Sequence, residues 1–246
     1  MYKRQELLAA IYVLALLQAG IPARLQLGLG PRELVQPALA QGLVDVVPEY
    51  LGTALASLEP AAGVQVLRPA AAQNQDGLVV TRATAARLRL RTISDLSPFA
   101  PQLVLGGPPE CPQRPSGLPG LCRVYGLEFA RFVPLDTEHE RIRALGHGAA
   151  DVVVTGTACG YLTSGDLVLL ADDRQLQPPG NIVPVVSAGA AARYGARLAS
   201  ALDAVSARLT TTDLIHLNRQ VTVDGHNVLA EARAWLERQH ILPQPG

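Results

Sequence analysis

The sequence predicts an α/β fold, because short apolar strands alternate with helical stretches along most of the chain. Hydrophobic residues make up 48% of the 246 residues and aromatic residues only 4%, so the core is built mainly from Leu, Val and Ala. This length allows one large core or two small lobes. The 21 basic residues balance 21 acidic ones, which argues against a strongly basic face and against nucleic acid as a partner.

The first 20 residues are predicted to form a buried helix. Leu7, Ile11 and Leu14 recur at helical spacing, and Gly20 stands just past the end. A basic start before an apolar run also resembles a signal peptide, but Glu6 interrupts that order. We therefore favour the helix and recognise no clear signal peptide in this chain. No stretch reaches the ~18 apolar residues of a membrane span.

The next elements follow in order. We expect a strand over 24–29, a helix over 31–41, a strand over 44–47, a short strand over 78–80 and a helix over 84–88. Pro31 suits the first turn of its helix and Gly42 the position past its end, whereas Pro37 should kink it.

The rest of the chain continues the alternation. Strands are expected over 103–106, 150–155, 167–171 and 181–186, and helices over 95–99, 118–125, 138–145, 193–208, 212–220 and 228–239. Ser94 is the expected cap of the first of these helices. Such alternation predicts a mostly parallel sheet with helices on both faces.

Catalytic and cofactor motifs are missing from the sequence. Ser164, His147 and Asp166 occur without a G-x-S-x-G turn. Gly28-x-Gly30 is only the first half of a dinucleotide fingerprint. The five His lack ligand spacing and no C-x-x-C pair is present, so neither a metal nor a cofactor is expected. We expect a protein that is not an enzyme.

The most informative motif is Pro48-Glu49-Tyr50-Leu51-Gly52-Thr53-Ala54, which follows the Gly42–Asp45 turn. It places an aromatic ring, a carboxylate and a hydroxyl at the end of a short apolar strand. Ligand clefts of α/β domains lie at such strand ends.

This run resembles the "G-x-(I/V)-D-(L/V)-Y-P-E-Y-T-G-T" signature of the substrate-binding proteins of glycine betaine/choline/carnitine (osmoprotectant) ABC transporters. Four further blocks are similar to that family in the same order and cover nearly the whole chain. They are Thr92-Ile-Ser-Asp-Leu96; Gly106-Gly-Pro-Pro-Glu110 with Arg114 and Tyr125-Gly-Leu127; Leu167 to Asp173 with Pro178-Pro179-x-Asn181; and Leu209 to Val221.

The resemblance implies a two-lobed fold of the type II periplasmic binding protein kind. Residues 1–80 and 182–246 would form lobe 1 and residues 81–181 lobe 2, with crossings near 78–81 and 181–184. The ligand is expected between the lobes, which would close about this hinge. The family's first strand, which precedes its first helix, has no counterpart here, so this N-terminal strand is expected to be missing.

The implied function is that of the substrate-binding component of an ABC importer, with a permease in the membrane as its partner. The protein would bind a small osmoprotectant-like or related polar ligand outside the cytoplasm, at the cell surface or in the periplasm. An alternative is a degenerate or repurposed sensor of the same fold that no longer binds betaine.

In this family, tyrosine rings hold a quaternary ammonium through cation–π attraction. Tyr50 and Tyr125 match two of these tyrosines, whereas Gly180 replaces a third, and Tyr161 is a possible substitute. The smaller cage predicts weak betaine binding. Polar contacts are expected from four residues: Thr53, Asn74, Thr157 and Asn181. The alternatives are core tyrosines with satisfied hydroxyls, and turn capping by the four polar residues.

Three cysteines are an odd number. Cys111 and Cys122 flank a segment rich in Pro and Gly, and a bridge between them would contribute ~2–3 kcal/mol. Such a bridge needs Cα atoms within ~7 Å and would leave Cys159 free. The alternative is three reduced thiols.

Overall fold

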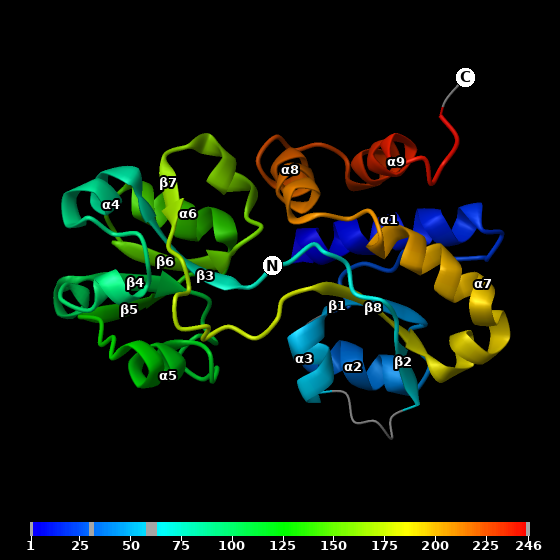
Figure 1. Ribbon diagram of the computed structural model, residues 1–246, viewed down its shortest axis with the longest axis horizontal. Helices are drawn as coiled ribbons and strands as arrows, with labels where there is room; N and C mark the ends of the chain where they lie inside the picture. The colour runs from blue at the N-terminus through cyan, green and yellow to red at the C-terminus, as the bar shows by residue number, and fades with distance from the viewer. Residues whose placement is uncertain (1, 30–31, 58–62, 245–246) are drawn as a thin grey trace. The chain divides into compact units, whose positions relative to one another are not determined.

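The computed structural model describes residues 2–29, 32–57 and 63–244, and the chain forms two compact units (Figure 1). Unit 1 is Gln75–Pro178, and unit 2 comprises Tyr2–Asn74 and Pro179–Gly246. The chain therefore enters unit 1 after Asn74 and leaves it after Pro178. The sequence placed these crossings near 78–81 and 181–184, a few residues later.

Unit 2 is built on a three-stranded sheet with the order β1-β8-β2. Its elements are α1 (Tyr2–Gln18), α2 (Arg32–Ala40), β1 (Val46–Tyr50), α3 (Leu51–Ser57), β2 (Val64–Val66), β8 (Ile182–Ser187), α7 (Ala188–Ser206), α8 (Thr211–Thr222) and α9 (Val228–Arg238). Both β1 and β2 pair with β8 in antiparallel register, because β8 is the strand that returns from unit 1.

Helices cover both faces of this sheet, with α1 and α7 on one side and α2 and α3 on the other (Figure 1). Leu7 and Ile11 of α1 are fully buried, as is Trp235 of α9. The predicted N-terminal helix is confirmed. It ends at Gln18, and the turn after it contains Gly20, whose φ of 71° is the left-handed conformation that glycine adopts easily.

The predicted strand over 24–29 is wrong. Residues 21–29 form neither helix nor strand, since no described neighbour pairs with their backbone. The α3 helix and the short strands β2 and β5 were not predicted at all. The longer helices and the buried strands were predicted to within a few residues.

Unit 1 is built on a five-stranded sheet with the order β5-β4-β6-β3-β7. Its elements are β3 (Asp76–Thr81), α4 (Arg82–Leu88), η2 (Ser94–Leu96), η3 (Ala100–Gln102), β4 (Val104–Gly107), α5 (Leu118–Gly120), η4 (Leu121–Tyr125), β5 (Arg131–Pro134), α6 (Glu138–Gly146), β6 (Val152–Gly156), η5 (Gly160–Ser164) and β7 (Leu167–Leu169). Strand β4 pairs in parallel with β5 and β6, whereas β3 pairs antiparallel with both β6 and β7. The prediction of a mostly parallel sheet was therefore wrong.

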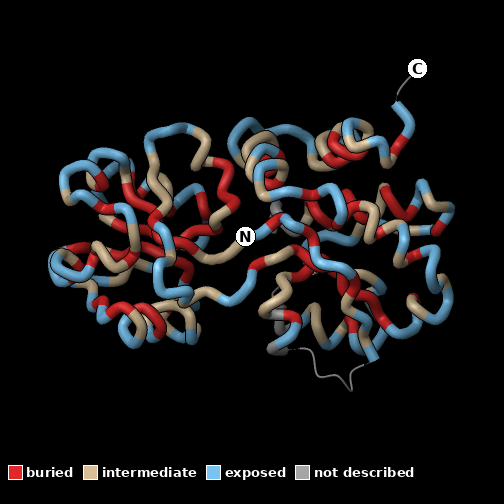
Figure 2. The backbone as a smooth tube through the Cα atoms, viewed as in Figure 1, coloured by how far each residue is buried: buried red, intermediate tan, exposed pale blue. Residues whose placement is uncertain are grey.

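Each face of the unit 1 sheet carries its own apolar core, visible as buried stretches in Figure 2. Leu78 and Val80 of β3 pack into the larger cluster with Leu105 and Leu121, whereas Val79 faces the smaller cluster beneath α6. This division follows from the period of two along a strand, which sends successive side chains to opposite faces.

The predicted bridge between Cys111 and Cys122 was wrong, because all three cysteines are free. Cys111 is buried in the larger core cluster, whereas Cys122 is exposed on η4. The Cys111 thiol is enclosed by the core of unit 1 and the Cys122 thiol is at the surface, so the two lie in different environments. Among the described residues, no helix is both long and apolar enough to cross a membrane.

Candidate ligand-binding site

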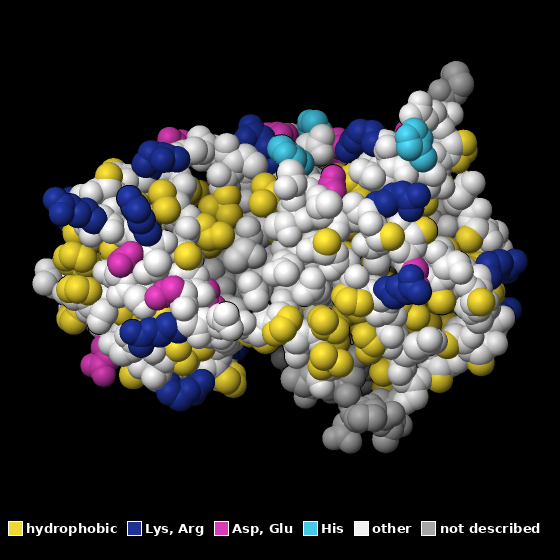
Figure 3. All heavy atoms as spheres, in the orientation of Figure 1, with side chains coloured by type: hydrophobic (Ala, Val, Ile, Leu, Met, Phe, Trp, Pro, Cys, Tyr) yellow, Lys and Arg dark blue, Asp and Glu magenta, His cyan; other side chains and the backbone are white. Residues whose placement is uncertain are grey.

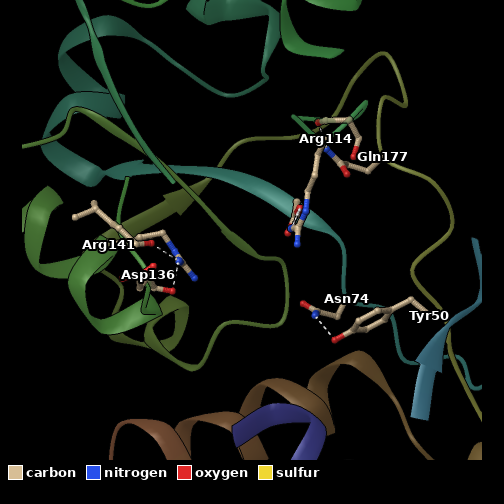
Figure 4. A network of polar contacts seen from close by, with 9 residues as sticks. Tyr50, Asn74, Arg114, Asp136, Arg141 and Gln177 are labelled. Atoms are coloured by element: carbon tan, nitrogen blue, oxygen red, sulfur yellow. Dashed lines mark hydrogen bonds and ion pairs between the residues drawn. The ribbon is translucent and has the colours of Figure 1, made fainter. Parts of the chain in front are cut away.

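Tyr50 is the last residue of β1, where three buried residues, Val47 to Glu49, lead into it. Its ring is half-buried, and its hydroxyl accepts a hydrogen bond of 3.0 Å from Asn74 Nδ2 (Figure 4). Asn74 is anchored in turn, because its backbone N–H donates to the carbonyl of Gly180 at 2.9 Å. Two predicted site residues of unit 2 thus lie in contact beside the crossings.

Asn181 joins the same cluster mainly through its backbone. Its carbonyl accepts the N–H of Leu51 at 2.8 Å, and it forms an isolated bridge with Gln73. Its side-chain Nδ2 donates to the carbonyl of Ala70 at 2.9 Å. Asn181 therefore fixes the chain on which Tyr50 and Asn74 depend. The side chain of Thr53 lies outside the described residues.

In unit 1, Thr157 follows β6 and holds the start of the segment that leads into β3. Its Oγ1 accepts the N–H of Gln75 at 3.0 Å, and its own N–H donates to the Gln75 carbonyl at 2.8 Å. The Gln75 side chain donates to the carbonyl of Pro178 at 2.8 Å. The two passages of the chain are thereby tied together on the unit 1 side.

Arg114 received no role in the sequence analysis, although it stood within a motif. Its Nη1 lies 3.8 Å from the Asp76 carboxylate. Gln177 lies nearby in Figure 4 and donates from Nε2 to the carbonyl of Ser116 at 3.1 Å. Together with Cys111, these residues line a cavity of about 20 Å³. This space is too small for a ligand but marks a polar edge of unit 1.

Tyr161 is half-buried on η5, and its hydroxyl lies 3.0 Å from His139 Nδ1. The two ring centroids are 6.2 Å apart. Burial raises the pKa of the Tyr161 hydroxyl, and the nearby Glu138 charge raises it further. Tyr161 therefore stays a neutral phenol beside a negative group.

Glu138 is the residue that sequence reasoning missed. It occupies the first turn of α6 and is only 9% exposed. Its Oε1 accepts a hydrogen bond of 2.8 Å from Thr155 Oγ1 at the end of β6. Burial raises the pKa of the neighbouring Cys159 thiol to about 12, and Glu138 adds to this effect. A buried carboxylate next to a tyrosine at a strand end is an arrangement that suits a cation.

Tyr125 has a different environment, because it is 4% exposed and packs in the larger core of unit 1. Its hydroxyl donates to Asp172 and accepts the N–H of Arg174 at 2.8 Å. The Arg174 guanidinium carbon lies 5.5 Å from the ring centroid, so one of the protein's own cations already sits over this ring. Burial and the Asp172 carboxylate raise the pKa of Tyr125.

Charges of both signs are interspersed on the face shown in Figure 3, and no large patch of one sign stands out there. Within the described ranges, no group of three or more His, Cys, Asp and Glu side chains could hold a metal ion.

Three comparisons with known proteins bear on this arrangement. Residues 2–238 match the family model described as the substrate binding domain of ABC-type glycine betaine transport systems. The chain is 26% identical to the glycine-betaine-binding protein of Pseudomonas aeruginosa, across 98% of this chain and 86% of that protein.

Two solved structures share the fold. A glycine betaine/carnitine/choline ABC transporter structure has a TM-score of 0.81 and 21% identity, covering 98% of this chain and 96% of that one. An ABC-transporter choline-binding protein in complex with choline has a TM-score of 0.72 and 17% identity, covering 99% and 88%. These matches establish a fold of the type II periplasmic binding protein kind.

Proposed function

Because this chain belongs to the family of substrate-binding domains of ABC-type glycine betaine transport systems, we propose that it binds a small quaternary ammonium compound for import. Substrate-binding proteins of ABC transporters are extracytoplasmic, bind small ligands and interact with a membrane permease. We extend these properties to this chain: a cell-surface or periplasmic location, a permease partner and no covalent chemistry. The family match over residues 2–238 is the observation that carries the proposal.

The ligand chemistry suits the side chains at the candidate site. A trimethylammonium group donates no conventional hydrogen bond, so it must be held by aromatic faces and by negative charge. In unit 2, Tyr50 offers a half-buried ring whose hydroxyl is already held by Asn74. A ring fixed in this way loses little freedom on binding. We place Thr53 and Asn181 beside it as polar contacts or supports.

In unit 1, Tyr161 and Glu138 have the matching properties. The ring is half-buried, the carboxylate is nearly fully buried, and a cation near both would gain from each. A desolvated cation–π contact contributes ~2 kcal/mol. Thr157, which holds Gln75, is the neighbouring polar residue.

We assign Tyr125 an indirect role. Its hydroxyl is engaged by Asp172 and Arg174, and its ring lies in the core of unit 1. Both observations favour a tyrosine that holds the loop over 172–177 in place. This assignment leaves Tyr50 and Tyr161 as the aromatic contacts.

Titration calorimetry with choline and glycine betaine tests the function. We expect saturable binding of at least one of them, and a loss of tenfold or more, about 1.4 kcal/mol, for Tyr50→Ala. Tyr50→Phe keeps the ring and should lose less. Tyr194→Ala is the matched control, because Tyr194 is a half-buried tyrosine of the same unit on α7.

The outcomes separate two claims. If neither compound binds at millimolar concentration, the proposed ligand class is wrong. If one binds and Tyr50→Ala binds it as tightly as Tyr194→Ala does, the class stands and the site is wrong.

A further inference from the structure

Asp76 and Arg114 form an ion pair at the polar edge of unit 1, and the proposed function gives this pair no role. Arg114 Nη1 lies 3.8 Å from the Asp76 carboxylate, which is longer than a hydrogen bond. Among the described residues, neither side chain has a hydrogen-bond partner. The pair therefore keeps unused donors on Arg114 and unused acceptors on Asp76.

The backbone fixes both members of the pair. Asp76 is the first residue of β3 and pairs with Gly156 at the end of β6. Arg114 lies in a tight turn, where its N–H donates to the carbonyl of Glu110 at 3.1 Å and its carbonyl accepts the N–H of Gly117 at 2.9 Å. The two charged side chains thus start from positions that a small ligand does not have to rearrange.

The pair lies beside the carboxylate that we assign to the ligand cation. Gly156, opposite Asp76, directly follows Thr155, whose hydroxyl bonds Glu138. Residues directly opposite each other in a sheet share a face, and successive residues alternate. Asp76 therefore points to one face at this strand end and Thr155 to the other. A ligand that lies across the strand end can place its ammonium on one side and its tail on the other.

The chemistry of the pair suits one kind of tail. The Asp76 carboxylate only accepts hydrogen bonds, and the Arg114 guanidinium only donates them. A hydroxyl does both, so it can donate to Asp76 and accept from Arg114 at once. A ligand carboxylate can only accept, and it would bring a second negative charge to a guanidinium that already has one beside it.

Arg141 does not offer a ligand carboxylate an alternative partner. It is 3% exposed, and its Nη1 donates to the carbonyls of Leu135 at 2.9 Å and Asp136 at 3.1 Å (Figure 4). Arg114, whose side chain is 37% exposed, is therefore the guanidinium that a ligand carboxylate would meet, and Asp76 stands next to it.

We propose that the Asp76–Arg114 pair selects a quaternary ammonium compound with a hydroxyl tail, such as choline, over one with a carboxylate tail, such as glycine betaine. This inference rests on the proposed function and narrows it. The Asp76 and Arg114 side chains are 41% and 37% exposed, so water and salt screen their charges. The expected selectivity is therefore about tenfold and not many orders of magnitude.

Titration calorimetry with choline and glycine betaine tests the proposal, because the two ligands share the trimethylammonium group and differ in the tail. We expect the wild type to bind choline about tenfold more tightly than glycine betaine. Asp76→Asn removes the repulsion and leaves Arg114 to the ligand, so it should raise betaine affinity about fivefold and lower choline affinity about threefold. Adding Arg114→Gln to Asp76→Asn should cancel the gain for betaine.

The matched control is Asp224→Asn. Asp224 pairs with Arg219 at 3.4 Å in unit 2, and these side chains are 34% and 42% exposed, so the variant removes the same charge from a similar ion pair. It should change either affinity by less than about twofold.

The outcomes separate this inference from the proposed function. If choline binds and Asp76→Asn changes the ratio of the two affinities no more than Asp224→Asn does, the function stands and the inference is overturned. Tighter binding of betaine than of choline by the wild type overturns it as well, and binding of neither ligand overturns both. If Asp76→Asn does not fold, Arg114→Gln alone decides: it should raise the preference for choline about threefold, and an unchanged or lower preference counts against the pair.

Discussion

The hydroxyl of Tyr125 donates a hydrogen bond to Asp172, and the same carboxylate also accepts backbone N–H groups from Leu176 and Gln177 at 3.0 and 2.9 Å. The N–H of Arg174 donates to the Tyr125 oxygen at 2.8 Å. One buried tyrosine therefore fastens a whole loop to the core of unit 1. The chain leaves that unit at Pro178, directly after this loop.

Removing this hydroxyl should destabilise unit 1. Tyr125→Phe keeps the packed ring but leaves the Arg174 N–H without its acceptor, so the free energy of unfolding should fall by ~1–3 kcal/mol. Urea denaturation measures this change. Tyr161→Phe is the control, because it removes a hydroxyl that is less buried and whose partner, His139, is exposed. Equal losses of unfolding free energy for the two variants would contradict the role of the Tyr125 hydroxyl in fastening the loop to the core.

The three thiols should differ sharply in reactivity. Cys122 is exposed, whereas Cys111 and Cys159 are buried. Burial raises the pKa of both buried thiols, that of Cys159 to about 12, which lowers the fraction of each that is the reactive thiolate. A thiol-reactive dye should label one cysteine quickly in the folded protein and all three in urea. Cys122→Ser should abolish the fast phase. No fast phase in the wild type, with two thiols recovered only by a reductant, would instead restore the Cys111–Cys122 bridge.

Gly117 should not tolerate a methyl group. A Cβ built there would lie 2.1 Å from the carbonyl oxygen of Cys111, and a backbone atom cannot move aside as a side chain could. Gly117→Ala should therefore lower the free energy of unfolding by ~1–3 kcal/mol or more. Gly146→Ala, where nothing lies within 4 Å of the added atom, is the control. A Gly117→Ala protein as stable as the control would show that this turn can rearrange.

Local signals in the sequence located most elements of the fold. Thr137, Thr210 and Asn227 cap the helices that follow them, so those helix starts could be read directly. The direction of the strands could not be read in this way. β8 runs antiparallel to β1 because of the path by which the chain returns from unit 1, and no local signal encodes that path. The 24–29 stretch shows the same limit: its pattern is that of a strand, but a strand also needs a partner.

The candidate site was predictable to a similar degree. The end of β1 brings Tyr50 next to Asn74, a contact between two candidate residues that the sequence had named separately. The burial of Tyr125 depends on packing between distant segments, which a motif does not encode. Glu138 was overlooked because an acidic residue in the first turn of a helix is ordinarily an exposed, dipole-favoured group. Glu140, two residues later, fills that ordinary role and completes the capping box with Thr137.

This pair of glutamates supplies the last prediction. Glu138 and Glu140 share the first turn of α6, so converting either to Gln removes one charge from the same helix end. Only Glu138 is buried and bonded to Thr155. Glu138→Gln keeps a side-chain oxygen that can accept the hydrogen bond from the Thr155 hydroxyl, and the volume of the side chain stays similar. It should therefore fold normally and lose the negative charge that we propose attracts the ligand cation.

We expect Glu138→Gln to weaken choline binding by tenfold or more, about 1.4 kcal/mol, and Glu140→Gln by less than about twofold, since an exposed charge is screened. The Cys159 thiol provides a second readout, because the Glu138 charge contributes to its raised pKa. That pKa should fall in Glu138→Gln and stay unchanged in Glu140→Gln, measured by the pH dependence of thiol alkylation. If the pKa falls while choline affinity is unaltered, the charge has been removed as intended, and Glu138 is a structural carboxylate with no part in the ligand site.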